Sequence, residues 1–214
     1  MAETILVTGA SAGFGQAICH RLVADGHRVI GAARRIEKLQ ALQEELGEAF
    51  YPLQMDVTDL SQVDHALASL PKAWERVDVL INNAGLALGL APAYEAELAD
   101  WLTMIQTNII GLTYLTRQIL PQMVERNDGY VINMGSTAGT VPYPGANVYG
   151  ASKAFVKQFS LNLRADLAGK QIRVTNIEPG LCEGTEFSSV RFKGDEKRVE
   201  ALYRDAHAIQ PEDI

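Results

Sequence analysis

The stretch TILVTGASAGFG, residues 4–15, decides the fold of this chain. Its first five residues predict a short buried strand, its three glycines a tight turn, and residues 16–25 a helix. Glycine permits positive φ and lets the backbone approach a bound group closely, while the unpaired N–H groups of a first helical turn attract an anion. A strand, glycine turn and helix that bind a diphosphate are therefore expected. A tight turn without a ligand is the alternative.

Apolar runs of strand length recur between helical stretches along the rest of the chain. They lie at residues 5–8, 28–33, 50–54, 79–82, 130–134 and 173–177. Continuous apolar strands that alternate with amphipathic helices indicate a parallel sheet covered on both faces. We expect one domain over residues 1–214, an α/β doubly wound Rossmann-type fold with strand order 3-2-1-4-5-6. Ligands of such sheets bind where the order reverses, between the first and fourth strands, where Gly9 and residues 82–85 fall.

Composition points to small-molecule chemistry. The 214 residues are 47% hydrophobic, enough for one buried core, and 19 basic against 26 acidic residues give a net charge of −7. No basic block suggests nucleic acid, and the apolar runs fall short of the ~20 residues that span a bilayer. We expect no nucleic-acid or membrane partner and, since the four histidines lack ligand spacing, no metal.

Cys19 and Cys182 lie far apart, and the N-terminus lacks a signal-peptide pattern. These features favour a reducing, cytoplasmic location. Packing roles are expected for both cysteines.

The pentapeptide at residues 149–153 places a phenol and an ammonium one helical turn apart, because Tyr149 and Lys153 have i, i+4 spacing. Free tyrosine titrates near pH ~10, and a cation within a few ångströms favours the phenolate. A tyrosine tuned in this way could donate or accept a proton near neutrality. The alternative is a chance pair on a solvated helix face.

Six motifs occur in the order and spacing of the short-chain dehydrogenase/reductase family, which the chain resembles over essentially its whole length. They are Thr8-Gly9-x3-Gly13-x-Gly15, Asn82-Asn83-Ala84-Gly85, Asn108, Ser136, Tyr149-x3-Lys153 and Pro179-Gly180. Residues 82–90, 123–127, 135–139, 147–153 and 184–195 further resemble the bacterial NADP-dependent 3-hydroxy acid dehydrogenases, a subfamily also known as serine or allo-threonine dehydrogenases and malonic semialdehyde reductases.

The resemblance implies four catalytic residues. Tyr149 would exchange a proton with the substrate oxygen, and Lys153 would lower the pKa of Tyr149 and bind the nicotinamide ribose. Ser136 would donate a hydrogen bond where negative charge develops, and Asn108, a poor helix former in a helical context, would belong to a proton relay. For Ser136 a turn role, and for Asn108 a local helix irregularity, are the alternatives.

Cofactor choice depends on Arg34 and Arg35 at the end of the second strand, where no acid occurs before Glu37. Guanidinium groups bind a 2′-phosphate by forked hydrogen bonds, so NADP is the expected cofactor. Exposed arginines without this role are the alternative. By resemblance, the other cofactor contacts would be Gly9, Ser11, Ala12, Gly13, Phe14, Gly15, Asp56, Val57, Asn83, Tyr149, Lys153, Pro179, Gly180 and Thr185.

A substrate pocket is expected from Ser136, Tyr143, Asn147 and a lid at residues 181–208. Arg191, or otherwise Lys193, could hold a substrate carboxylate. Both could instead be solvated charges on a flexible loop.

The resulting prediction is hydride transfer between NADP(H) and a short 3-hydroxy acid or its semialdehyde or keto form. Another carbonyl, such as a 3-ketoacyl thioester or a sugar, and a non-catalytic dinucleotide sensor are the alternatives. By resemblance, members of the family continue beyond residues 210–214 with a helix, a seventh strand and a tail, so six strands and not seven are expected in residues 1–214. By resemblance a homo-oligomer, a tetramer, is expected.

Overall fold

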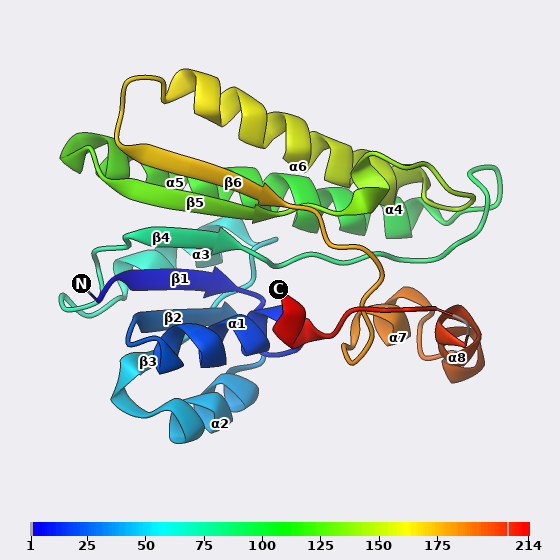
Figure 1. Cartoon of the computed structure of the whole chain (residues 1–214), viewed down its shortest axis with the longest axis horizontal. Coiled ribbons are helices and arrows are strands. Elements are labelled where there is room, and N and C mark those ends of the chain that lie inside the picture. The colour runs from blue at the N-terminus through cyan, green and yellow to red at the C-terminus, as the bar shows by residue number, and fades with distance from the viewer. Residues whose placement is uncertain (1, 205) are drawn as a thin grey trace.

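The computed structural model describes residues 2–204 and 206–214. Its centre is a six-stranded parallel sheet of order β3-β2-β1-β4-β5-β6 (Figure 1), so the predicted doubly wound fold and its strand order are confirmed. The strands are β1 Thr4–Thr8, β2 Arg28–Ala33, β3 Phe50–Gln54, β4 Val79–Asn82, β5 Gly129–Met134 and β6 Ile172–Ile177.

Helices connect the strands and build the carboxyl edge of the sheet. The α-helices are α1 Gly13–Ala24, α2 Ile36–Leu46, α3 Leu60–Ala68, α4 Leu98–Ile105, α5 Leu112–Arg126, α6 Asn147–Asp166, α7 Phe187–Arg191 and α8 Glu196–Tyr203. Short 3-10 helices are η1 Gly47–Ala49, η3 Thr137–Gly139 and η4 Pro211–Asp213, and η2 Gln106–Gly111 is a π-helix. None of the helices in residues 2–204 and 206–214 is both long and apolar enough to cross a membrane.

Alternation along the strands builds two cores, one on each face of the sheet. Leu6, Leu80 and Val131 belong to the core that packs under α3, α5 and α6. Ile5 and Val79, their neighbours in the strands, belong to the opposite core, which α1 and α2 cover. Strands β1 to β4 are therefore packed on both faces, and their carboxyl ends are held in defined positions.

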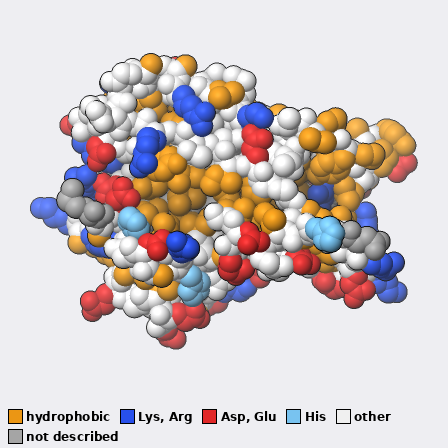
Figure 2. Space-filling view, viewed as in Figure 1, with side chains coloured by type: hydrophobic (Ala, Val, Ile, Leu, Met, Phe, Trp, Pro, Cys, Tyr) orange, Lys and Arg blue, Asp and Glu red, His pale blue; other side chains and the backbone are white. Residues whose placement is uncertain are grey.

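Cover is incomplete on the α1 face beyond β4. Tyr130 and Ile132 of β5 are only half-buried there, and Figure 2 shows hydrophobic side chains gathered in the middle of this face. The C-terminal segment stays at the carboxyl edge of the sheet, where η4 lies beside α1 (Figure 1) and Ile209 pairs with Cys182. The C-terminal segment therefore packs against the start of the predicted lid.

The turn after β1 needs glycine for two reasons. Gly9 and Gly13 have φ values of 68° and 53°, in the left-handed region. A Cβ at Gly15 would lie 2.2 Å from the carbonyl oxygen of Gly9, so the first turn of α1 can approach β1 only without a side chain. The turn consequently opens directly onto the carboxyl ends of β1 and β4.

Thr8 joins these two strand ends. Its Oγ1 accepts hydrogen bonds from the backbone N–H groups of Asn83 at 3.0 Å and Ala84 at 2.9 Å and donates to the carbonyl of Ile81 at 3.3 Å. In return, Asn83 Nδ2 donates to the carbonyl of Thr8 at 2.7 Å. Thr8 is 2% exposed, so water cannot easily replace these bonds.

Replacing Thr8 by valine should lower the free energy of unfolding by about 2–4 kcal/mol, because two backbone donors lose their acceptor in a buried environment. Urea unfolding followed by tryptophan fluorescence measures the effect. The control is Thr8→Ser, which keeps the hydroxyl and loses only a methyl group, a change of about 1 kcal/mol. Equal effects of the two substitutions would show that packing, and not the hydroxyl, matters at this position.

Candidate active site

A cleft of about 640 Å³ opens at the carboxyl edge of the sheet and runs from the end of β2 to the segment around α7. It brings together most of the residues that the sequence singled out. These are Gly9, Ser11, Ala12, Gly13, Phe14, Arg34, Arg35, Asp56, Val57, Asn83, Ser136, Tyr143, Tyr149, Lys153, Pro179, Gly180, Thr185 and Arg191. Three of the predicted site residues, Gly15, Asn108 and Asn147, do not line it.

The wall of the cleft that the glycine turn and Arg35 form is suited to an anion. Helix α1 begins beside the glycine turn, and no side chain caps its first N–H groups, which leaves them free for an anionic group. Arg35 reaches back to this turn, with Nη2 3.1 Å from Ser11 Oγ. The residues present therefore fit a dinucleotide with its diphosphate on the turn.

Gly15 contributes to the turn from behind. The contact that excludes a side chain at Gly15 is with the backbone of Gly9, so Gly15 shapes the cleft without forming its surface. Its predicted contact with a cofactor becomes a packing role in the structure.

Asn147 is not among the residues that line the cleft, and its substrate contact remains a prediction. Its Oδ1 accepts from Trp101 Nε1 at 3.0 Å and from the backbone N–H of Val148 at 2.8 Å, and its Nδ2 donates to the carbonyl of Ala91 at 3.1 Å. With φ of 21°, Asn147 fixes the start of α6 against α4 and the loop before it. These partners could not be found from the sequence, since Trp101 and Ala91 are distant from Asn147 in the chain.

Asn108 lies behind the cleft wall in the π-helix η2 and is 1% exposed. Its Oδ1 accepts from the N–H of Leu86, and its Nδ2 donates to the carbonyl of Leu86 and to Ser152 Oγ, at 2.9, 2.9 and 3.0 Å. The helix irregularity considered as an alternative is thus present, and it holds a fully bonded amide. Single π-turns inside helices often accompany functional sites.

Gly85 separates Asn108 from Lys153. A Cβ at Gly85 would lie 3.3 Å from Asn108 Oδ1 and 3.4 Å from Lys153 Nζ, so a side chain here would contact both polar groups. The relay between Asn108 and Lys153 remains a prediction, and Gly85 lines the cleft at the point where it would pass.

Lys153 is buried in α6, and its Nζ donates to the carbonyl of Met134 at 2.8 Å. Burial lowers the pKa of Lys153 to about 8. Its Nζ lies 5.9 Å from the ring centroid of Tyr149.

Tyr149 is 8% exposed, and its ring packs against Phe187 of α7 with centroids 5.7 Å apart. Its pKa is raised above the ordinary value, chiefly by burial, while a hydrogen bond with Ser136 and the charge of Arg191 act in the opposite direction. Lys153 is not among the groups that shift this pKa, and its effect on the phenol remains a prediction. With a raised pKa, Tyr149 keeps its proton near neutrality.

Arg191 is the cation that sequence reasoning did not connect with Tyr149. Its guanidinium carbon lies 5.4 Å from the Tyr149 ring centroid, and the side chain is 8% exposed. Its Nε donates to the carbonyl of Gly89 at 3.2 Å and its Nη2 to the hydroxyl of Tyr143 at 3.0 Å. A permanent charge thus stands at the inner end of the cleft.

Lys193, the second candidate for a carboxylate, forms an ion pair with Asp100 at 2.9 Å and does not line the cleft. Arg191 is therefore the better placed of the two cations. The alternative that both are solvated charges on a flexible loop does not describe Arg191.

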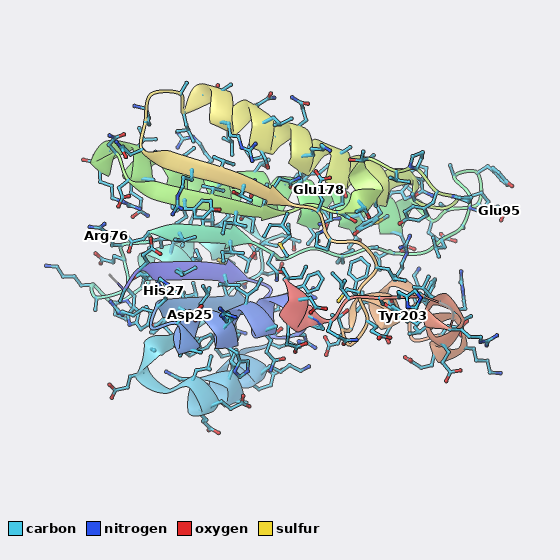
Figure 3. The ribbon with its side chains drawn as sticks, viewed as in Figure 1. Asp25, His27, Arg76, Glu95, Glu178 and Tyr203 are labelled. Atoms are coloured by element: carbon cyan, nitrogen blue, oxygen red, sulfur yellow. The ribbon has the colours of Figure 1, made fainter. Side chains whose placement is uncertain are left out.

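The predicted lid over residues 181–208 contains α7 and α8, which Tyr203 holds together. Its hydroxyl donates to the carbonyl of Cys182 at 2.7 Å and lies 2.6 Å from Ser188 Oγ; Figure 3 labels Tyr203 within this segment. Cys182 is a free thiol, and burial raises its pKa to about 11, which keeps it protonated. A packing role for Cys182 agrees with this surrounding.

Glu186 was missed from the sequence. It stands just before α7, and both of its oxygens bond to cations at the β2–α2 junction: Arg35, which precedes α2, and Lys38, in the first turn of α2. Glu186 lies 151 residues from Arg35 in the chain, so no local sequence pattern could predict that the two residues are in contact.

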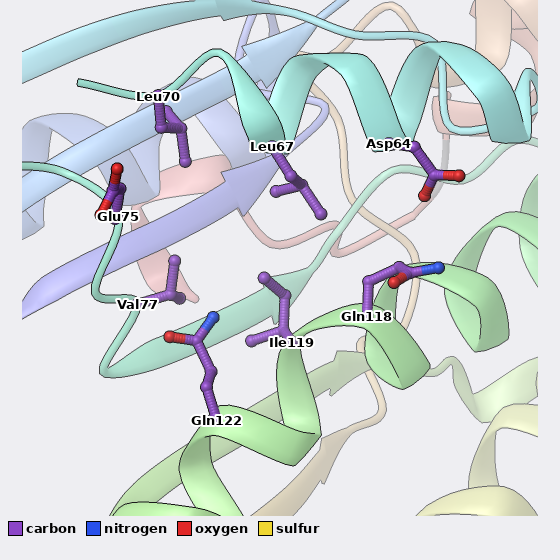
Figure 4. Close-up of a pocket in the computed structure, with 8 residues that line it drawn as sticks. All are labelled: Asp64, Leu67, Leu70, Glu75, Val77, Gln118, Ile119 and Gln122. Atoms are coloured by element: carbon purple, nitrogen blue, oxygen red, sulfur yellow. The ribbon is translucent and has the colours of Figure 1, made fainter. Parts of the chain in front are cut away.

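A second, smaller pocket of about 210 Å³ lies between α3 and α5, away from the glycine turn (Figure 4). Leu67 and Ile119 form part of its apolar floor, and Asp64 at its rim accepts a hydrogen bond from Tyr114. Among residues 2–204 and 206–214, no three His, Cys, Asp or Glu side chains are grouped closely enough to hold a metal ion.

The sequence matches the family model described as short chain dehydrogenase over residues 3–196. The chain belongs to this family. Within it, the chain is 60% identical to the NADP-dependent 3-hydroxy acid dehydrogenase YdfG of Salmonella typhi over 98% of this chain and 85% of that protein. It is 52% identical to the serine 3-dehydrogenase of Rhizobium radiobacter, over 100% and 85% of the two chains.

Solved short-chain dehydrogenases share the whole architecture. The closed form of serine dehydrogenase complexed with NADP⁺ superposes with a TM-score of 0.96 at 58% identity, covering 98% of this chain and 85% of that one. The resemblance inferred from the six motifs is confirmed, and with it an oxidoreductase fold.

The lowered pKa of Lys153 predicts how stability depends on pH. The pKa of Lys153 is about 8 in the folded protein and ~10.4 in the unfolded chain, so the folded protein loses this proton at a lower pH than the unfolded chain does. The free energy of unfolding of the wild type therefore increases as the pH rises through 8. Between pH 7 and 9 it should gain about 1–1.5 kcal/mol relative to Lys153→Met, as measured by urea unfolding of both proteins at each pH. A difference that does not change with pH would contradict the burial of a charged ammonium.

Proposed function

We propose that this protein is an NADP-dependent oxidoreductase that transfers a hydride between NADP(H) and a short 3-hydroxy acid or its semialdehyde or keto form. The observation that carries the proposal is the buried Tyr149, which lines the cleft together with Ser136 and Lys153 and lies close to the guanidinium of Arg191. The relatives named as NADP-dependent 3-hydroxy acid dehydrogenase and serine 3-dehydrogenase support the same substrate class.

The nicotinamide of the bound cofactor supplies the hydride, and the protein holds it in place. The glycine turn with Ser11 and Gly13 would bind the diphosphate, and Arg34 and Arg35 the 2′-phosphate. Asp56 and Val57 would meet the adenine. Asn83, Tyr149, Lys153, Pro179, Gly180 and Thr185 would line the ribose and nicotinamide side.

Tyr149 handles the proton. In the direction of reduction its hydroxyl donates to the substrate oxygen, and in oxidation its phenolate accepts the same proton. Ser136 donates a hydrogen bond to that oxygen as charge develops on it. Lys153 binds the ribose hydroxyls and, through the space that Gly85 leaves, connects Tyr149 with Asn108.

Arg191 distinguishes a hydroxy acid from other alcohols. Its guanidinium lies near Tyr149 in the same cleft, so it would meet the carboxylate of a short substrate whose oxygen is held by Tyr149. An unpaired carboxylate in a cleft with apolar walls would be costly to desolvate, and the guanidinium fork fits its two oxygens. A carbonyl reductase for uncharged substrates would have no need of this charge.

Assembly and location follow from the family resemblance. We expect a homotetramer in the cytoplasm, and two free cysteines are compatible with a reducing compartment. Both statements remain predictions.

Tyr149→Phe should lower kcat about a hundred- to ten-thousandfold, because the variant loses only the group that transfers the proton. NADPH consumption with small 3-oxo acids and semialdehydes measures turnover, and fluorescence titration should show nearly unchanged NADPH affinity. If the variant kept most of its kcat, Tyr149 would not be the acid. If the wild type itself were inactive on the whole panel, a non-catalytic dinucleotide sensor would be the better reading.

Arg191→Ala should reduce kcat/KM for a 3-hydroxy acid roughly ten- to a hundredfold, the ~1.5–3 kcal/mol of a charged hydrogen bond. The methyl ester of the same acid should be much less affected, which separates carboxylate binding from the influence of Arg191 on Tyr149. Arg191→Lys keeps the charge without the fork and should fall between. An equal loss for acid and ester would mean that Arg191 serves only the loop or the phenol.

A further inference from the structure

Glu186 ties the lid to the end of β2. Its Oε2 accepts from Arg35 Nη2 at 2.8 Å, while its Oε1 accepts from Arg35 Nη1 at 3.2 Å and from Lys38 Nζ at 2.7 Å. The fork of Arg35 is thus occupied in bidentate fashion by a carboxylate of the same chain. These bonds lower the pKa of Glu186 to about 2, so the carboxylate stays charged at any pH at which the enzyme would work.

This contact lies in the place where a 2′-phosphate is expected. Arg35 Nη2 also contacts Ser11 Oγ of the glycine turn at 3.1 Å, and Ser11, Arg35 and Glu186 line the same cleft. The neighbouring Thr185 packs on the turn, since a Cβ at Gly13 would lie 3.2 Å from its side chain. The start of the lid therefore rests directly on the phosphate-binding wall.

A carboxylate and a phosphate cannot both use one guanidinium fork in this way. The phosphate dianion brings more charge and more acceptor oxygens than a carboxylate, so it can displace the carboxylate from the same donors. A displaced but nearby carboxylate still repels the phosphate. A cofactor with a free 2′-hydroxyl does not compete with the carboxylate for Arg35, because the hydroxyl is uncharged.

We propose that Glu186 is an internal competitor for the 2′-phosphate of the cofactor, and that it sets how strongly NADP(H) is preferred over NAD(H). In the absence of that phosphate, its carboxylate occupies Arg35 and Lys38; NADP(H) binds by replacing it. The inference rests on the proposed NADP dependence and makes Glu186 a residue that determines cofactor specificity.

The test is Glu186→Gln, which keeps the size of the side chain and removes its charge. NADPH and NADH are titrated by fluorescence against wild type and variant at low salt. The Kd for NADPH should fall about five- to tenfold in the variant, and the Kd for NADH should change less than twofold. Titration with adenosine 2′,5′-bisphosphate and ADP, which lack the nicotinamide, should show the same contrast and so exclude effects at the substrate end.

Glu183→Gln provides the matched control. Glu183 belongs to the same lid, but its Oε1 accepts from Gln210 at 2.8 Å and not from a cation at the end of β2. The substitution removes one lid charge without touching Arg35 or Lys38, so both cofactors should bind as they do to wild type. Thermal unfolding of all three proteins checks that each is folded.

Weaker NADPH binding by Glu186→Gln would overturn the proposal, because Glu186 would then hold the two cations in place for the phosphate. Equal changes for both cofactors would also overturn it and leave Glu186 a lid contact only. The wild-type titrations report separately on the proposed function. If wild type showed no preference for NADPH, the NADP dependence itself would fail, whatever the variant does.

Discussion

The hydrogen bonds between Thr8 and the chain after β4 are the constraint on which the site depends. They draw together the ends of two adjacent parallel strands, and the glycine turn can then leave β1 at close range to Asn83. Strands β1 and β4 lie on either side of the point where the strand order reverses, and the cleft opens at their carboxyl ends because the connections leave in opposite directions there.

Burial sets the acid–base properties of the centre, and it acts on its two titrating groups in opposite directions. It raises the pKa of Tyr149 and lowers that of Lys153, since each loses stability in its charged form when water is removed. Near neutrality the phenol is therefore protonated and the ammonium charged. Ser136 and Arg191 are the groups that favour the phenolate, and they come from two separate segments, the turn after β5 and the end of α7.

Helix α7 links the two ends of the cleft. Glu186, which precedes it, contacts the cations at the end of β2, and Arg191, its last residue, reaches Tyr143 and lies near Tyr149. One short element thereby joins the adenosine end to the reacting end. Tyr203 fastens it to the segment that follows, so the lid is tied down at several points.

The sequence by itself determined the strands, their order and the glycine turn, because hydrophobic periodicity and turn chemistry are local properties. The resemblance of six motifs to the short-chain dehydrogenases implied one site with Ser136, Tyr149 and Lys153, and the residues at the end of the second strand implied a cofactor contact for Arg34 and Arg35. Only the tertiary structure decided which side chains face the cleft. Asn147 turns to Trp101, Lys193 pairs with Asp100, and Glu186 meets Arg35, all across long separations in the chain. The sign of the pKa shift at Tyr149 was likewise beyond the sequence, because spacing predicts a nearby cation, whereas the depth of burial, which outweighs it, arises only when the elements pack.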